Sequence, residues 1–275
     1  MNYRAYWNTV KSRRHKVNED RLMISEYTFM GDYTVRLLVV ADGMGGLENG
    51  ETASYNAVSG FLESFYSELM KAYLKTDMEK YSARHDYRGI KEAMTASAQA
   101  ANRSVCRGAG RLEETGSTIS AVCIVEDYAV AVNVGDSPIY YYDGQRDRLS
   151  LISRLQTEAE LKAERGEYER YSIEYYEDDH RLYNYLGGYE HLEEKDICTY
   201  PIGRIRTGDA ILIGSDGAFG RISEDTIRME LSESLDDGED AERFFLDNLF
   251  EMARADKDDD QTAVLYVIAE EEEEE

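Results

Sequence analysis

Cysteine, proline and long apolar runs are all scarce in this sequence of 275 residues, and each scarcity argues against a class of protein. The three cysteines, Cys106, Cys123 and Cys198, lie far apart with no Cys-x-x-Cys or Cys/His spacing. They indicate neither a disulfide framework nor a zinc site, and we interpret them as core thiols. The only prolines are Pro138 and Pro201. No apolar run approaches the roughly 20 residues of a membrane span.

Basic residues are also scarce relative to acidic ones. The sequence has 31 Lys and Arg against 56 Asp and Glu, which gives a formal net charge of −25. Such a charge argues against nucleic acid or an anionic membrane as the main partner. The terminal run Glu270 to Glu275 predicts a disordered acidic tail, because it repels itself and lacks apolar residues. Residues 1–7 lack the apolar core of a signal peptide, so we expect a cytoplasmic protein. We also expect the protein to be a monomer.

The most informative stretch is residues 37–46, Leu-Leu-Val-Val-Ala-Asp-Gly-Met-Gly-Gly. Its five apolar residues predict a strand that is buried on both faces and ends at Asp42. The glycines allow close backbone approach, so a metal ion or its water could reach the Asp42 carboxylate and the Gly43 carbonyl. A single aspartate in this setting is more simply a turn residue. The pattern recurs at residues 210–217, where an apolar run leads to Asp216, and the repetition favours a shared site.

The rest of the chain is typical of short strands and two pairs of amphipathic helices. Three strands between residues 117 and 142 are predicted to form an antiparallel meander. Residues 153–189, rich in charges and tyrosines, are predicted to be a flap that is partly helical and partly mobile. We expect one domain over residues 1–269, followed by the acidic tail 270–275. The helices are predicted around residues 53–69, 90–105, 223–233 and 239–253.

Acidic residues gather where predicted strands begin or end. They are Glu19, Asp20, Asp42, Asp216 and the cluster Asp258 to Asp260. Carboxylates brought together would repel one another, and Mg²⁺ or Mn²⁺ would compensate them, since no His or Cys cluster favours zinc. Two such ions can activate a bridging water and clamp a phosphoryl group. The carboxylates therefore indicate metal-dependent hydrolysis of a phosphate ester. Asp136 follows a glycine in a predicted turn and is equally well explained as a turn residue.

Six motifs follow one another in the order found in a known family. The chain resembles the metal-dependent type 2C (PPM) protein phosphatases, most closely the bacterial branch, over nearly its whole length. The motifs are Arg13-x-His15-x-x-Asn18-Glu19-Asp20, Val40-Ala41-Asp42-Gly43-Met44-Gly45-Gly46, Gly116-Ser117-Thr118, Val134-Gly135-Asp136-Ser137, Gly214-Ser215-Asp216-Gly217 and Asp259-Asp260-Gln261-Thr262.

The resemblance implies a fold, a reaction and a set of ligands. The fold would be α+β, a four-layer α/β/β/α sandwich of two mainly antiparallel sheets flanked by helices. The reaction would be hydrolysis of phosphoserine and phosphothreonine on proteins modified by a serine/threonine kinase. Two Mn²⁺ or Mg²⁺ ions, and a third in some members, would be needed. The resemblance implies that Asp42 bridges two ions, that the Gly43 carbonyl is a further ligand, and that Asp216 and Asp259 hold the second ion. It also implies that Asp20 and Glu19 act mainly through bound water and that Asp136 joins Asp216 at the third ion.

Three positions depart from the family pattern. The family's phosphate-binding arginine corresponds to His15, with Arg14 beside it, so we place His15 among the catalytic candidates as a weaker phosphate anchor. Met44 stands where eukaryotic members have a histidine, and bacterial relatives commonly share this methionine. Pro138 replaces the usual arginine after Gly-Asp-Ser.

The main alternative is a weakly active or inactive relative that binds phosphoproteins or another partner, which the His15 replacement motivates. Two other interpretations of residues 256–267 fail. A haloacid-dehalogenase-like nucleophile motif must follow a strand, whereas here the strand comes after it. An EF-hand would need glycine where Gln261 stands and glutamate where Val267 stands.

Overall fold

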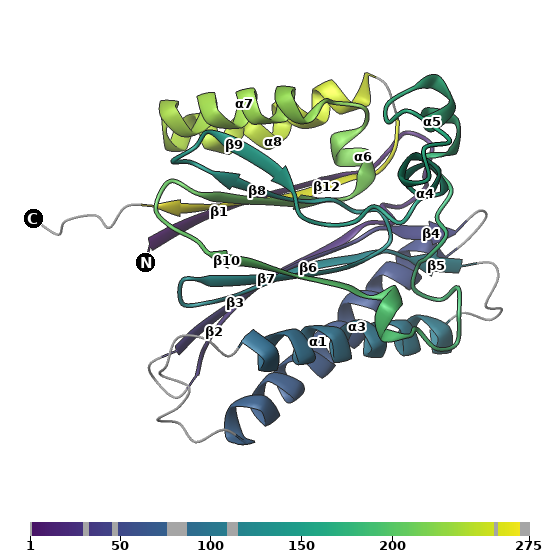
Figure 1. Ribbon diagram of the computed structural model, residues 1–275, viewed down its shortest axis with the longest axis vertical. Coiled ribbons are helices and arrows are strands. Elements are labelled where there is room, and N and C mark those ends of the chain that lie inside the picture. Colours follow the sequence, from purple (N-terminus) through teal and green to yellow (C-terminus); the bar gives the residue numbers. More distant parts are fainter. Residues whose placement is uncertain are drawn as a thin grey trace, which may run out of the picture.

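The computed structural model describes residues 2–29, 33–45, 49–75, 87–108, 115–255 and 258–269. Two five-stranded antiparallel sheets lie face to face, and helices cover both outer faces (Figure 1). The predicted four-layer α/β/β/α sandwich is therefore confirmed. The tail at residues 270–275 lies outside the described residues. In the described part of the chain, no helix is both long enough and apolar enough to cross a membrane.

The upper sheet in Figure 1 contains both termini of the described fold. Its strand order is β1 (Asn2–Val10), β12 (Gln261–Ala269), β11 (Ala210–Gly214), β8 (Ile139–Asp143) and β9 (Arg148–Leu151). Two antiparallel helices, α7 (Glu224–Asp237) and α8 (Glu239–Arg254), cover it. The Ser223 hydroxyl caps α7 by accepting a hydrogen bond from the Thr226 N–H.

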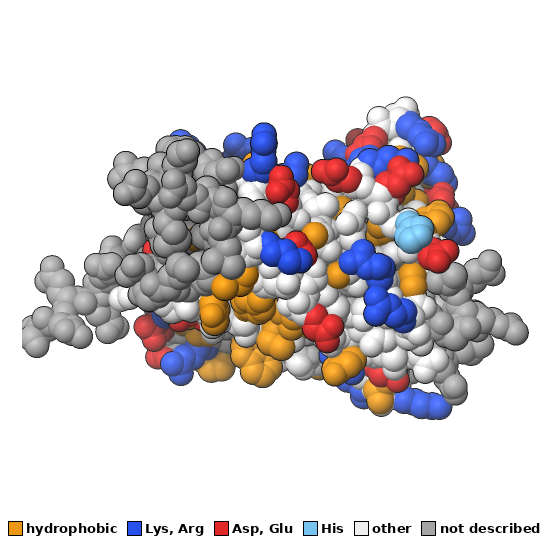
Figure 2. Space-filling model, turned by 90° about the horizontal axis from the view of Figure 1, so that it is seen from below, with side chains coloured by type: hydrophobic (Ala, Val, Ile, Leu, Met, Phe, Trp, Pro, Cys, Tyr) orange, Lys and Arg blue, Asp and Glu red, His pale blue; other side chains and the backbone are white. Residues whose placement is uncertain are grey.

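The lower sheet carries the longer pair of helices. Its strand order is β10 (Cys198–Arg204), β7 (Tyr128–Val134), β6 (Ile119–Val125), β3 (Tyr33–Ala41) and β2 (Arg21–Phe29), and the covering helices are α1 (Gly50–Lys75) and α3 (Tyr87–Gly108). The face below α1 and α3 mixes basic and acidic side chains with one group of exposed apolar side chains (Figure 2). The acidic excess of the sequence is therefore not concentrated on this face.

Three apolar layers fill the spaces between the four layers of structure. Leu37 and Val39 of β3 pack under α1 and α3, whereas Leu38 and Val40 pack between the two sheets. Because β3 is buried on both faces, its sequence is continuously apolar and does not alternate. The same is true of β12, where Leu265 faces α7 and α8 and its neighbours face the other sheet.

The predicted meander is wrong in its third strand. β6 and β7 pair as expected, but β8 belongs to the opposite sheet, where it lies between β11 and β9. Residues 135–138 therefore cross from one sheet to the other and carry Asp136 with them. The sequence could not reveal this crossing, because a short strand buried on both faces has the same apolar pattern in either sheet.

The cysteine interpretation is also wrong in part. Cys123 is buried in β6, but Cys106 and Cys198 are only half-buried, and all three are free thiols. Cys106 lies near the end of α3, and its thiol donates to the Tyr189 carbonyl at 3.5 Å.

The segment predicted as a flap, residues 153–189, contains two short helices, α4 (Glu158–Glu164) and α5 (Ile173–Asp178). They lie at the end of the sandwich that also holds β4 (Gly43–Gly45) and β5 (Thr115–Ser117) (Figure 1). Glu160 of α4 accepts hydrogen bonds from Arg170 and from the Tyr175 hydroxyl. The helical part of the flap is confirmed, and its mobility stays a prediction.

Candidate metal centre

The acidic residues singled out in the sequence lie where strands of both sheets begin or end. Asp42 follows β3, and Asp20 precedes β2, whose first residue pairs with the last residue of β3. In the other sheet, Asp216 begins the short helix α6 (Asp216–Phe219) just after β11, and Asp260 precedes β12, which pairs with β11. Antiparallel pairing therefore brings the end of one strand beside the start of its neighbour in each sheet.

Hydrogen bonds hold the backbone N–H and carbonyl groups of Asp42. Its N–H donates to Thr118 Oγ1 at 3.0 Å, and its carbonyl accepts from Ser117 Oγ at 3.0 Å and from the Thr118 N–H at 2.8 Å. The Gly-Ser-Thr motif thus clamps both sides of the Asp42 peptide and leaves the carboxylate unconstrained by these bonds.

The Asp42 carboxyl group lies in a strongly acidic environment. Burial raises the pKa of Asp42 well above its usual range, and the negative charges of nearby aspartates raise it further. Four carboxylates acting on one group is the arrangement that a bound cation would relieve. These aspartates are Asp20, Asp216, Asp136 and Asp259.

Asp20 is 2% exposed and has one satisfied and one unsatisfied carboxylate oxygen. Ser215 Oγ donates to Asp20 Oδ2 at 2.7 Å, whereas the buried Oδ1 has no hydrogen-bond partner. Burial, assisted by the charges of Asp260 and Asp216, raises the pKa of Asp20 to about 7 despite hydrogen bonds that lower it. A buried carboxylate oxygen without a partner is costly, and a proton or a metal-bound water would satisfy it.

Gly43 occupies a position that accepts no side chain. A Cβ at Gly43 would lie 2.1 Å from the Gly50 carbonyl oxygen and 2.6 Å from the Glu19 carbonyl oxygen. The carbonyl of Glu19 also accepts from Ser54 Oγ at 2.5 Å. The start of α1, the Glu19 loop and the Gly43 backbone therefore pack in direct contact, as the glycines after β3 suggested.

The donor set fits a hard divalent ion in its chemistry. It consists of carboxylates and one backbone carbonyl, includes an orphaned buried oxygen, and is dominated by mutual repulsion. Within the described ranges, no group of three or more His, Cys, Asp or Glu side chains is by itself arranged to hold an ion.

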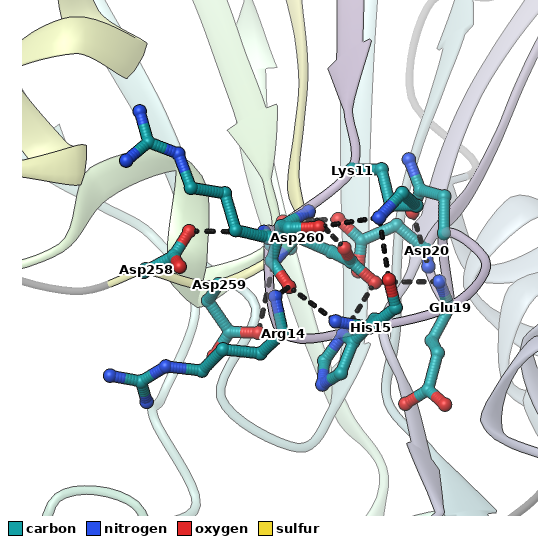
Figure 3. Close-up of polar contacts among 12 residues, drawn as sticks. Lys11, Arg14, His15, Glu19, Asp20, Asp258, Asp259 and Asp260 are labelled. Atoms are coloured by element: carbon teal, nitrogen blue, oxygen red, sulfur yellow. Dashed lines mark hydrogen bonds and ion pairs between the residues drawn. The ribbon is translucent and has the colours of Figure 1, made fainter.

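Asp260 has a structural role that the sequence did not reveal. It is 3% exposed, and its Oδ1 accepts from the Ser12 N–H at 2.6 Å while its Oδ2 accepts from the Glu19 N–H at 2.7 Å. It thereby joins the loop before β2 to the loop before β12 (Figure 3). Nothing in a run of three consecutive aspartates indicates which one turns inward, because that depends on the path of the loop.

His15 lies beside this acidic cluster. Its Nδ1 is 2.9 Å from Asp260 Oδ2, and its side chain is 36% exposed (Figure 3). Burial lowers the pKa of His15, but the hydrogen bond to Asp260 and the charges of Asp260, Glu19 and Asp259 outweigh it, so the net pKa is raised. The Arg14 side chain points away from His15 in Figure 3. The structure therefore sets His15, and not Arg14, beside Asp260.

Asp136 lies in the crossing between the sheets and is 9% exposed. The next residue, Ser137, shares a 2.6 Å hydrogen bond with Thr118, the residue that also holds Asp42. The Thr118 side chain thus contacts both the Asp42 backbone and the residue after Asp136, which brings the crossing between the sheets beside the end of β3.

Comparison with known proteins identifies the family. A protein of Streptococcus pyogenes serotype M6, whose name assigns it to the 2C-type protein phosphatases, is 26% identical over 209 residues, covering 70% of this chain and 71% of the relative. The serine/threonine phosphatase PstP/Ppp of Mycobacterium tuberculosis superposes with a TM-score of 0.70 at 23% identity, covering 98% of this chain and 99% of the other. The catalytic domain of PstP in complex with two manganese ions superposes with a TM-score of 0.64 at 23% identity, with coverage of 98% and 99%.

The family match extends beyond single motifs. The model of the family described as protein phosphatase 2C matches residues 11–265, which includes every acidic residue of the candidate centre. The two sheets, their flanking helices and this match agree, and the chain belongs to the protein phosphatase 2C family.

Proposed function

We propose that this chain hydrolyses phosphoserine and phosphothreonine esters on proteins, with Mn²⁺ or Mg²⁺ bound in the carboxylate cluster. The observation that carries the proposal is the gathering of four aspartates around the carboxyl group of Asp42, from both sheets of the sandwich. Family membership supports the reaction class. We further propose that residues 1–269 act as one monomeric catalytic domain and that its substrates are products of a serine/threonine kinase. The cytoplasmic location stays a prediction.

We propose for these residues the ligand roles that the family resemblance implies. Asp42 would hold both ions, the Gly43 carbonyl would be a further ligand, and Asp216 and Asp259 would hold the second ion. Asp20 and Glu19 would act through bound water, and Asp136 with Asp216 would hold a third ion. When bound, the ions would supply an activated water and a charge clamp for the phosphoryl group.

The remaining polar residues orient these groups. Thr118 and Ser117 fix the Asp42 backbone, and Ser215 fixes one oxygen of Asp20, so the other oxygen stays available. Asp260 holds His15 and raises its pKa together with other carboxylates, which favours the charged imidazolium that would attract a phosphate. A guanidinium would still be the stronger anchor, since it is permanently charged and bidentate.

One assay tests the proposal. Purified protein is incubated with an aryl phosphate or a phosphothreonine peptide, in EDTA or with added Mn²⁺, beside Asp42→Asn and Asp216→Asn. We expect Mn²⁺-dependent turnover that falls by at least about 1,000-fold in either variant, because each removes a carboxylate from the metal clamp.

Asp247→Asn is a suitable control, since Asp247 lies on the exposed side of α8. Asp136→Asn should reduce turnover less than Asp42→Asn, because a third ion would tune the reaction and not define it. Protein that binds Mn²⁺ but hydrolyses no faster than Asp42→Asn would instead support the phosphoprotein-binding alternative.

A further inference from the structure

The strand β1 forms one edge of the upper sheet, where it pairs with β12 on one side. Its nine residues pair one to one with those of β12, without a bulge or a proline. At β10, which forms an edge of the other sheet, Pro201 and a shift of register discourage pairing with another strand. β1 lacks both features, so it offers a long and regular edge to a further strand.

The outward backbone groups of β1 can be identified from the hydrogen bonds that β12 makes on its other side. The Ile268 N–H donates to the Asp209 carbonyl at 2.9 Å, and the Ser215 N–H donates to the Thr262 carbonyl at 2.8 Å. The even-numbered residues of β12 thus face the β11 side, so its odd-numbered residues face β1 and pair there with even-numbered residues. The N–H and C=O groups that point away from β12 therefore belong to the odd-numbered residues of β1. These residues are Tyr3, Ala5, Trp7 and Thr9.

A groove of about 290 Å³ lies between β1 and α8. Residues 5–8 of β1 line it, together with Arg243, Leu246 and Asp247 of α8. Side chains alternate along a strand, so consecutive residues can line one groove only if the edge of the backbone is exposed in it. Leu246 is 2% exposed and supplies an apolar surface. The groove therefore combines an open strand edge with a helix that runs beside it.

The two faces of β1 differ in their chemistry. The side chains of its even-numbered residues turn toward α8, where Asn8 Nδ2 donates to Asp247 Oδ1 at 2.5 Å. Its odd-numbered residues face the other sheet, and among them the Trp7 side chain is 59% exposed. A strand added to β1 would therefore meet an indole on one face and the charged side of α8 on the other.

The charge along α8 favours a basic partner. Exposed residues at helical spacing form one stripe on α8 that includes the charged residues of the groove. They are Asp240, Arg243, Asp247 and Glu251, three acidic and one basic. The chain as a whole has a formal net charge of −25. An extended segment with basic side chains toward α8 and apolar side chains toward Trp7 complements both faces.

We propose that the β1 edge binds an extended segment of a phosphoprotein substrate as an added antiparallel strand, in which basic residues alternate with apolar ones. The inference rests on the proposed function, because it assigns this segment to the substrate. β1 runs toward the candidate centre: it ends at Val10, and the Ser12 N–H donates to Asp260 Oδ1 at 2.6 Å. A strand antiparallel to β1 runs away from the centre, so the phosphorylated residue would lie on the N-terminal side of the docked segment.

The fluorescence of Trp7, the only tryptophan of the chain, reads out docking without using activity. The probe is the blocked peptide acetyl-(Lys-Val)4-amide, titrated into the full chain. Directly opposite residues of an antiparallel pair project to the same face, so valines on the Trp7 face also turn their N–H groups toward β1. N-methylation of the valines removes these donors and should weaken binding at least about tenfold, whereas N-methylation of the lysines should change the affinity by less than about twofold.

Equal affinities of the two methylated peptides would overturn the proposal, since a basic peptide held only by the net charge does not distinguish them. Absence of binding would overturn it as well. Ala5→Pro removes one outward N–H and should weaken binding about fivefold or more, whereas the matched Ala5→Ser keeps this donor and should bind like the wild type. If Ala5→Pro does not fold, the methylated peptides decide the question with the wild type. A dimer of the peptide-free protein that Ala5→Pro dissociates would assign the edge to a second copy and overturn the proposal.

Two phosphothreonine peptides test the direction of docking. One carries (Lys-Val)4 after the phosphothreonine and the other carries it before, each through the same flexible linker. With Mn²⁺, the first should have a KM at least about fivefold lower at an unchanged kcat, and Ala5→Pro should remove this difference without changing hydrolysis of an aryl phosphate. Docking with equal KM values would overturn the assignment of the segment to the substrate. Absence of all hydrolysis would refute the proposed function, and the Trp7 titration would still decide whether the edge binds a strand.

Discussion

The buried carboxyl group of Asp20 makes a quantitative prediction about the protein without metal. Its pKa is raised to about 7, mainly by burial, whereas in an unfolded chain an aspartate titrates near 4. The folded state therefore binds a proton more tightly than the unfolded state. This contribution to stability is complete below about pH 4 and is lost as the pH rises through about 7.

The magnitude follows from the shift. Each pKa unit is worth about 1.4 kcal/mol, so the two units between pH 5 and a folded pKa of about 7 correspond to roughly 3 kcal/mol. In EDTA, titration of Asp20 should lower the free energy of unfolding of the wild type by about this amount between pH 5 and pH 8, in addition to the contribution of Asp42, whose pKa is also raised. That is a large fraction of the roughly 5–15 kcal/mol that stabilises most domains.

The perturbation is Asp20→Asn, which has no carboxyl group to titrate at this position. Urea unfolding followed by circular dichroism at pH 5 and pH 8, in EDTA, would measure the difference for both proteins. The fall in the variant should be smaller by about the contribution of Asp20, and Asp42, whose pKa is also raised, should account for part of what remains. Asp247→Asn, an exposed change on α8, should keep the whole fall. With saturating Mn²⁺ the wild-type trend should reverse, because metal binds the deprotonated carboxylates.

Parallel pH profiles for the wild type and Asp20→Asn in EDTA would refute this reasoning. They would mean that the unpartnered Oδ1 of Asp20 is solvated in solution and that desolvation does not control its ionisation.

Three further predictions concern the backbone, the phosphate anchor and the flap. Gly43→Ala should destabilise the fold by about 3 kcal/mol or weaken Mn²⁺ binding at least tenfold, because its Cβ would lie 2.1 Å from the Gly50 carbonyl oxygen. Thermal unfolding would show the first effect and calorimetry the second, and neither would appear if the loop could move aside freely. His15→Arg should lower KM about threefold or more at neutral pH, and the KM of the wild type should rise as the pH increases and His15 loses its proton. Arg14→Ala should leave KM unchanged, since the Arg14 side chain points away from His15. An unchanged KM in His15→Arg would mean that another cation anchors the phosphate. Deletion of residues 166–177 should reduce activity toward phosphoproteins more than toward an aryl phosphate. The deletion also removes Arg170 and Tyr175, the partners of Glu160, so it should be compared with Glu160→Gln. Equal losses on both substrates with a large drop in Tm would show that the segment is structural.

Local patterns in the sequence determined much of the architecture. The unbroken apolar run of residues 37–41 identified a strand buried on both faces, and β3 is such a strand, with Leu37 and Leu38 in different cores. The capping serine and the apolar spacing predicted the start of α7 correctly and placed its C-terminal end a few residues too early. These features could be predicted because burial and helix capping depend on residues only a few positions apart.

The sequence motifs by themselves also indicate most of the candidate centre. Asp20, Asp42 and Asp216 are strand-end aspartates, and a strand end is visible in a sequence as the point where an apolar run stops. The glycine requirement at Gly43 was likewise visible, although its cause, the close approach of Gly50 and Glu19, was not.

Only the tertiary structure decided which distant groups meet. The bond between Ser12 and Asp260 joins residues 248 positions apart, and the pairing of His15 with the same carboxylate depends on that loop contact. The strand at residues 139–143 entered the second sheet, and Gln156 became a buried link to Gly135, for the same kind of reason. Such contacts arise from the path of the whole chain, which no short window of sequence records, because each segment's pattern reports how deeply it is buried and not what it is buried against.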